Sequence, residues 1–83
     1  MRTKMNKYTV MLLTSHNGIP VLTYIEYCDT LTHAIKVGVG WAKDKGGCDL
    51  EVVRQELSGD NSYWNSGLDS VDNWSIYIVF PEE

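Results

Sequence analysis

The chain has 83 residues and a net charge of −4, with 43% hydrophobic and 22% charged residues. This composition is typical of folded globular proteins and excludes the low hydrophobicity and high charge of disordered chains. The longest uninterrupted apolar runs are far shorter than the roughly 20 residues that a membrane-spanning helix needs, so the sequence predicts no transmembrane segment.

The length predicts a single domain, which we expect to span residues 6–83. Residues 1–5 are positively charged, but no apolar segment or cleavage site follows them, so we predict a disordered extension rather than a secretory signal. The expected location is therefore cytoplasmic. Two cysteines, Cys28 and Cys48, are too few for the disulfide framework of a small secreted domain, and we expect free thiols.

Two apolar, β-branched segments, residues 6–15 and 21–28, predict the first two strands. Asn17-Gly18 lies between them, and this pair favours a hairpin because both residues tolerate the positive φ of a type I′ turn. Pro20 has no amide hydrogen to donate, so we expect it at the mouth of the second strand.

A helical period begins after Asp29-Thr30, and either side chain can cap a helix N-terminus. The apolar stripe of this helix consists of Leu31, Ala34, Ile35, Gly38, Trp41 and Ala42. Gly46-Gly47 predicts its end, because glycine adopts the left-handed conformation without steric cost. We interpret Gly38 as a residue that lets the helix approach the sheet closely.

The second half of the chain predicts two further strands. Residues 49–57 alternate and include two adjacent valines, which favours a third strand. Residues 58–73 are rich in Gly, Asn, Asp and Ser and predict a long loop. The fourth strand, residues 74–80, places on one face Trp74, Ile76, Ile78 and Phe80. The predicted fold is α+β in the order β-β-α-β-β, a four-stranded antiparallel sheet with one helix packed on one face.

No residue pattern predicts a catalytic site. Cys28 and His33 lie at the junction of the second strand and the helix, where they could act as nucleophile and base. The orienting group and the oxyanion donors that such a pair requires cannot be named. Glu26 and Asp29 flank the same junction, and helix capping is the simpler explanation for Asp29. We therefore do not expect an enzyme.

The sequence also predicts neither a metal site nor a cofactor. Zinc sites usually contain short paired units such as C-x-x-C or H-x-x-x-H, which place two ligands on one turn. The chain has four thiol and imidazole side chains without such paired spacing: His16, Cys28, His33 and Cys48.

Charge is distributed unevenly along the chain. Residues 1–42 contain four basic and two acidic residues, whereas residues 43–83 contain three basic and nine acidic residues. Nucleic-acid binders concentrate Lys and Arg on one face, so direct nucleic-acid binding is not expected. The acidic half either provides solubility or meets a basic surface on a partner protein, for example one that normally holds nucleic acid.

An aromatic pair, Tyr63-Trp64, lies in the predicted loop without any core periodicity around it. Aromatic residues on polar loops are typical of binding sites. Our candidate partner-binding residues are Tyr63, Trp64, Asp60, Asp69 and Asp72. The alternative for Trp64 is that it folds back over the core, because a small domain has few large residues to cover its edges.

These observations favour a small acidic protein-binding module, an adaptor or inhibitor that occupies a partner's surface. In size, acidity and element order the chain resembles accessory and inhibitor proteins of phages and mobile elements, although no motif identifies a specific family. One alternative is a small enzyme or ligand-binding domain that uses the Cys28/His33 junction. Another is a homodimeric structural module that pairs exposed strand edges.

Overall fold

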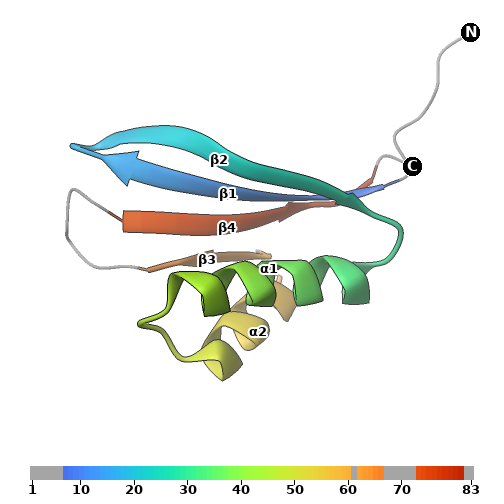
Figure 1. Ribbon diagram of the computed structural model, residues 1–83. Coiled ribbons are helices and arrows are strands. Elements are labelled where there is room, and N and C mark those ends of the chain that lie inside the picture. Colours follow the sequence, from blue (N-terminus) through green and yellow to red (C-terminus); the bar gives the residue numbers. More distant parts are fainter. Residues whose placement is uncertain (1–6, 61, 67–72, 82–83) are drawn as a thin grey trace, which may run out of the picture.

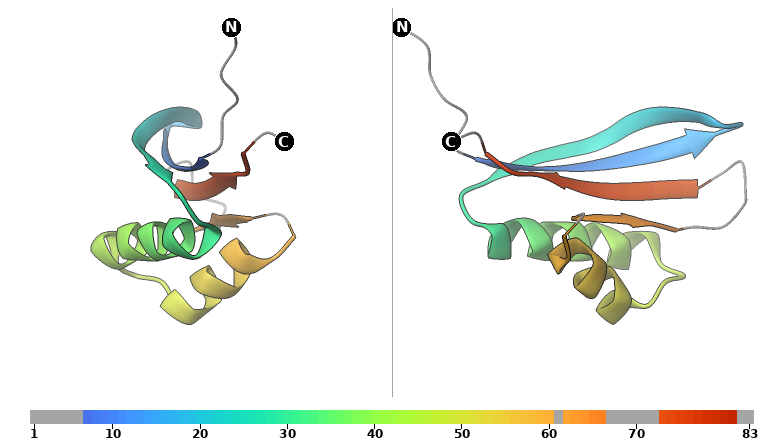
Figure 2. Two further views of the ribbon diagram at one scale, coloured as in Figure 1. Left: turned by 90° about the vertical axis from the view of Figure 1, so that its right-hand side faces the viewer. Right: turned by 180° about the vertical axis from the view of Figure 1, so that it is seen from behind.

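The computed structural model describes residues 7–60, 62–66 and 73–81. Its elements are β1 (Tyr8–His16), β2 (Ile19–Cys28), α1 (Leu31–Lys45), α2 (Leu50–Ser58), β3 (Tyr63–Asn65) and β4 (Asn73–Val79). The strands form one antiparallel sheet in the order β2-β1-β4-β3, and both helices pack on the same side of it (Figures 1 and 2). The α+β class and the four-stranded antiparallel sheet are confirmed, whereas the predicted single helix is corrected to two.

The β1–β2 hairpin is the best-predicted part of the fold. Its two-residue turn is Asn17-Gly18, with φ angles of 54° and 81°, and the residues on either side of the turn pair with each other. Positive φ at both positions is the requirement of a type I′ turn. The pairing register shifts between Leu12 and Leu13, so the hairpin contains a β-bulge. The predicted extension at residues 1–5 lies outside the described residues.

Local capping signals define α1. Thr30 is the N-cap, and its hydroxyl accepts a hydrogen bond from the His33 amide at 3.1 Å. Gly46 ends the helix with a φ of 77°. The predicted apolar stripe is confirmed, because the residues that α1 buries belong to it: Ala34, Gly38 and Ala42.

Gly38 allows α1 to lie close to the sheet and to α2. A Cβ atom at this position would be 2.7 Å from Leu57 Cδ1 and 3.2 Å from Ile76 Cγ2. Such distances are shorter than ordinary van der Waals contacts. The predicted role of Gly38 is therefore confirmed, whereas Gly40 has no atom within 4 Å of the same added carbon.

The predicted strand over residues 49–57 is wrong, because this segment forms α2. Asp49 caps the helix by accepting a hydrogen bond from the amide two residues later at 3.0 Å. Leu50, Val53 and Leu57 follow the i, i+3, i+7 spacing of one helix face, and the last two are completely buried. Packing of this face against the core overrides the strand preference of the adjacent valines.

The third strand comes instead from the segment predicted as a loop. β3 contributes three residues and pairs with β4 at the edge of the sheet opposite β2. Of the predicted loop, residues 67–72 lie outside the described residues. No helix in the described part of the chain is long and apolar enough to cross a membrane.

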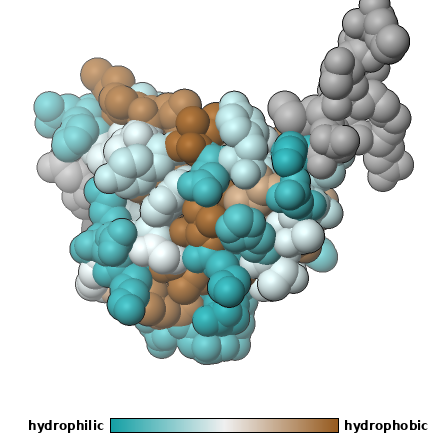
Figure 3. Space-filling view, turned by 45° about the vertical axis from the view of Figure 1, so that its right-hand side comes forward, coloured by the Kyte–Doolittle hydropathy of each residue, from teal (hydrophilic) through white to brown (hydrophobic). Residues whose placement is uncertain are grey.

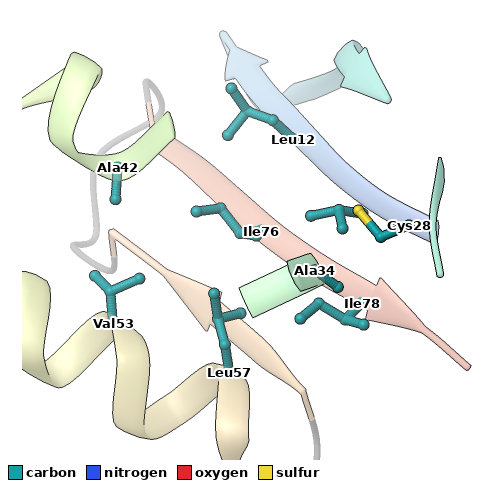
Figure 4. Close-up of a cluster of buried hydrophobic side chains, with 9 residues drawn as sticks. Leu12, Cys28, Ala34, Ala42, Val53, Leu57, Ile76 and Ile78 are labelled. Carbon is teal, nitrogen blue, oxygen red and sulfur yellow. The ribbon is translucent and has the colours of Figure 1, made fainter. Parts of the chain in front are cut away.

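The hydrophobic core lies between the sheet and the two helices (Figure 4). Its buried apolar residues are Val10, Leu12, Cys28, Ala34, Ala42, Val53, Leu57, Ile76 and Ile78. β1 and β4 are the central strands and supply four of these residues, whereas β2 supplies only Cys28, its last residue. The predicted inward face of β4 is confirmed at Ile76 and Ile78, while Phe80 follows the strand and is exposed.

Candidate functional site

Tyr63 and Trp64 do not form one aromatic surface, because consecutive residues of a strand point to opposite faces of the sheet. Trp64 pairs with the core residue Ile76, so its side chain lies on the face that the helices cover. Tyr63 lies on the other face, where its ring centroid is 4.6 Å from that of Tyr77.

Trp64 is partly buried and packs against the hydrophobic core. Its ring centroid is 4.8 Å from that of Trp74, and the Lys45 ammonium lies 5.9 Å from the centroid of the Trp74 ring. This position agrees with the alternative in which Trp64 covers the core. Asp60 is exposed after α2, and the other two candidates, Asp69 and Asp72, lie outside the described residues.

The junction of β2 and α1 brings together Glu26, Cys28 and His33. One oxygen, the sulfur and one ring nitrogen of these side chains all lie within 4.8 Å of one another. The sequence suggested a pair of Cys28 and His33 and placed Glu26 at the same junction, but without grouping its carboxylate with these two side chains. The available signal was the two-residue spacing of Glu26 and Cys28, which places both side chains on one face of a strand.

The surroundings of Cys28 disfavour its thiolate form. Burial raises its pKa above the ordinary value of 9.0, the charges of Glu26 and Asp29 raise it further, and Lys7 opposes this effect. The thiolate is the reactive form of cysteine, so a raised pKa disfavours nucleophilic catalysis at neutral pH. Asp29 does not cap α1 and instead accepts a hydrogen bond from the Lys7 ammonium.

Among the described residues, six of the ten exposed large hydrophobic side chains lie on β2. Nine of its ten residues are exposed, and only β1 pairs with it in the part of the chain that the structure describes. Six large side chains are 45–66% exposed and are defined here as the β2 surface: Ile19, Val21, Leu22, Tyr24, Ile25 and Tyr27. Figure 3 shows apolar groups that reach the molecular surface between polar side chains.

The sheet face opposite the helices continues this apolar character. Met11 pairs with Ile25 on one side and with Tyr77 on the other, and Tyr77 pairs with Tyr63. Paired residues project to the same face, so these four side chains form a row across all four strands. We call it the open-face row, and neither helix covers it, since both pack on the other side of the sheet (Figure 2).

A groove between α1 and α2 is a further candidate. Its apolar lining includes Ile35, and three cations surround it: Lys36, Lys43 and Arg54. All three cationic side chains are exposed, and Arg54 lies 3.8 Å from a carboxylate oxygen of Glu51. Among the described residues, no buried polar side-chain atom lacks a hydrogen-bond partner, so no such group points into the groove. The groove therefore contains no defined anion site.

No family model, curated protein or solved structure matches this chain. The functional argument therefore depends on the chemistry of the surfaces described above.

Proposed function

We propose that this protein is a protein-binding module, an adaptor or inhibitor, that pairs its β2 edge with an extended strand of a partner protein. The observation that carries the proposal is the exposure of six large apolar side chains on one ten-residue edge strand. An edge strand presents backbone N–H and C=O groups that can pair with another chain, and alternate side chains then determine which partner fits.

The two edges of the sheet differ in how far they are protected. Proteins that avoid edge pairing use short strands, prolines, bulges, charged residues or covering elements. β3 has only three residues and contacts α2. β2 is more than three times longer, and its only proline and only charged residue are Pro20 and Glu26. β2 also contains the register shift opposite Leu12 and Leu13 and contacts α1, but these features leave nine of its ten residues exposed.

The chemistry of β2 favours an apolar partner strand. Charged residues are scarce here, whereas the acidic residues of the second half include Glu51 and Glu56 on α2, away from β2. The open-face row adjoins β2 through Ile25, so a bound strand would extend an existing apolar surface. A basic partner surface, which the charge distribution of the sequence favours, would have to meet the helical side of the protein instead.

The experiment compares three forms of the full chain as bait in a lysate of the source organism. The test variant carries Leu22→Lys and Ile25→Lys, which place two charges on β2. The matched control carries Val52→Lys on α2, because Val52 is 44% exposed and Ile25 is 45% exposed. A partner retained by the wild type and identified by mass spectrometry is then titrated against each form, beside a thermal melt of each form.

We expect the β2 variant to melt like the control and to bind the partner at least about tenfold more weakly, which is about 1.4 kcal/mol. Equal affinity of the β2 variant and the wild type would contradict the proposal. Light scattering of the wild type alone provides the second readout. If the wild type forms a dimer and Leu22→Lys with Ile25→Lys dissociates it, then β2 pairs two copies of this chain. The protein would in that case be a homodimeric module instead of an adaptor.

A further inference from the structure

The junction between β2 and α1 holds three side chains whose chemistry is unused by the proposed protein-binding surface. The Glu26 carboxylate, the Cys28 thiol and the His33 imidazole offer ligand atoms within 4.8 Å of one another. Glu26 and His33 are exposed, whereas Cys28 is 1% exposed. The sulfur ligand atom of the cluster therefore belongs to a buried residue, whereas the carboxylate and the imidazole belong to residues exposed to solvent.

Regular secondary structure determines where each of these residues lies. Glu26 and Cys28 are two residues apart near the end of β2, so they project to the same face of the sheet. The chain then reverses, and the Thr30 N-cap starts α1 directly afterwards. The hydrogen bond from the His33 amide to the Thr30 hydroxyl places His33 in the first turn of α1, beside the end of the strand.

The three donor types together favour zinc over calcium and magnesium. Thiolate sulfur, imidazole nitrogen and carboxylate oxygen are the protein ligands of Zn²⁺, whereas Ca²⁺ and Mg²⁺ prefer oxygen ligands alone. Zinc sites with three protein ligands leave a fourth position for water or another ligand. A set of one Glu, one Cys and one His therefore has the number and type of ligands of an open zinc site.

The distances allow these ligands to reach one ion. With bond lengths of about 2.0–2.3 Å and tetrahedral angles, two ligand atoms on the same zinc ion are roughly 3.3–3.7 Å apart. No pair of ligand atoms in the cluster is more than 4.8 Å apart, so none has to approach by more than about 1.5 Å. Glu26 and His33 have exposed side chains that can rotate, so the buried Cys28 sulfur can stay in place.

We propose that Glu26, Cys28 and His33 bind one Zn²⁺ ion, with the fourth coordination position open to solvent. The ion joins the end of the edge strand to the first turn of α1. Because such a site exists only in the folded chain, zinc binding stabilises the fold. This site differs from the sequence-based expectation of no metal, because that expectation considered only thiol and imidazole side chains and did not count the Glu26 carboxylate as a ligand.

The test uses the full chain, freed of any affinity tag and of metal, and titrates it with Zn²⁺ in competition with a chromogenic chelator. We expect one zinc ion per chain and a higher Tm with zinc. His33→Ala and Glu26→Gln alter exposed side chains, so they preserve the fold. Loss of a supporting group around a metal costs about 10- to 100-fold in affinity, so loss of a direct ligand should cost about 100-fold or more.

Two matched controls use the other histidine and the other cysteine of the chain. His16→Ala and Cys48→Ser should bind zinc like the wild type. Co²⁺ in place of Zn²⁺ should give a sulfur-to-cobalt charge-transfer band that Cys48→Ser retains and Cys28→Ser loses. Absence of zinc binding, or binding that His33→Ala and Glu26→Gln leave unchanged, overturns the proposal.

Discussion

β2 and β4 are similar in amino-acid composition but occupy different environments in the fold. Both are rich in Ile, Val and aromatic residues, yet Ile76 of β4 is completely buried and Ile25 of β2 is 45% exposed. Among the described residues, β4 has a neighbouring strand on each side, whereas β2 pairs with β1 alone. Apolar composition therefore does not decide burial. Burial depends on where a strand lies in the sheet and on the face to which a side chain projects, because Ile76 faces the helices whereas Ile25 belongs to the open-face row.

The helices increase this difference. α1 and α2 both pack against β4, whereas α1 is the only one of the two helices that β2 contacts. One such contact joins Tyr24 and Trp41, whose ring centroids are 5.6 Å apart. The half of the sheet that contains β4 carries the core and should carry most of the stability. β2 can then contribute to binding at little cost in folding free energy.

The largest expected change in the free energy of unfolding is the difference between substitutions at two isoleucines, Ile76 of β4 and Ile25 of β2. Ile76→Ala should destabilise the protein by about 2–5 kcal/mol, because it leaves a cavity among fully buried side chains. Ile25→Ala should cost less than about 1 kcal/mol, because its side chain is already partly in water. Urea denaturation at low protein concentration measures both values. Equal losses would mean that another chain covers β2 in solution.

The next largest change in stability is expected between alanine substitutions at two glycines of α1, Gly38 and Gly40. Gly38→Ala should cost about 1–3 kcal/mol, because the added carbon would overlap the buried Leu57 side chain. Gly40→Ala should instead stabilise the protein by up to about 1 kcal/mol, since alanine has the higher helix propensity and nothing lies nearby. Denaturation midpoints of the two variants provide the measurement. If both variants were stabilised, α1 would not lie so close to the sheet.

The smallest effect concerns the exposed ion pair of Lys7 and Asp29 at the end of β2. The hydrogen bond and the charge of Lys7 lower the pKa of Asp29 below its ordinary value of 3.8. The pair therefore stabilises the folded state above pH 3.8, and this contribution disappears as the pH falls through the lowered pKa.

Thermal melts across this acidic range should show a weaker loss of stability for Lys7→Ala than for the wild type. The exposed Lys36 provides the control, because Lys36→Ala leaves the ion pair intact. The difference should be small, since water screens an exposed pair. Identical acid profiles for Lys7→Ala and the wild type would show that the pair contributes nothing.

Features that depend on neighbouring residues in the chain were predictable from the sequence. Asn17-Gly18 specifies the hairpin turn because both residues accept positive φ. Thr30 and Gly46 delimit α1 because each satisfies backbone groups at a helix end. The stripe that includes Gly38 identifies the buried face of α1, because side chains three and four residues apart share one side of a helix.

Features that depend on distant residues required the tertiary structure. The segment that forms α2 fits the period of a strand and the period of a helix, and only the packing of Val53 and Leu57 on the core selects the helix.

The candidate binding surface on β2 and the candidate metal site also required the tertiary structure. The sequence identifies the apolar residues of β2 but not the order of the strands, and the order alone leaves them at an edge. It likewise contains Glu26, Cys28 and His33, but only the reversal of the chain at Thr30 brings the His33 side chain to the other two. Local backbone preferences act within a few residues, whereas burial and clustering depend on contacts between segments that the sequence leaves far apart.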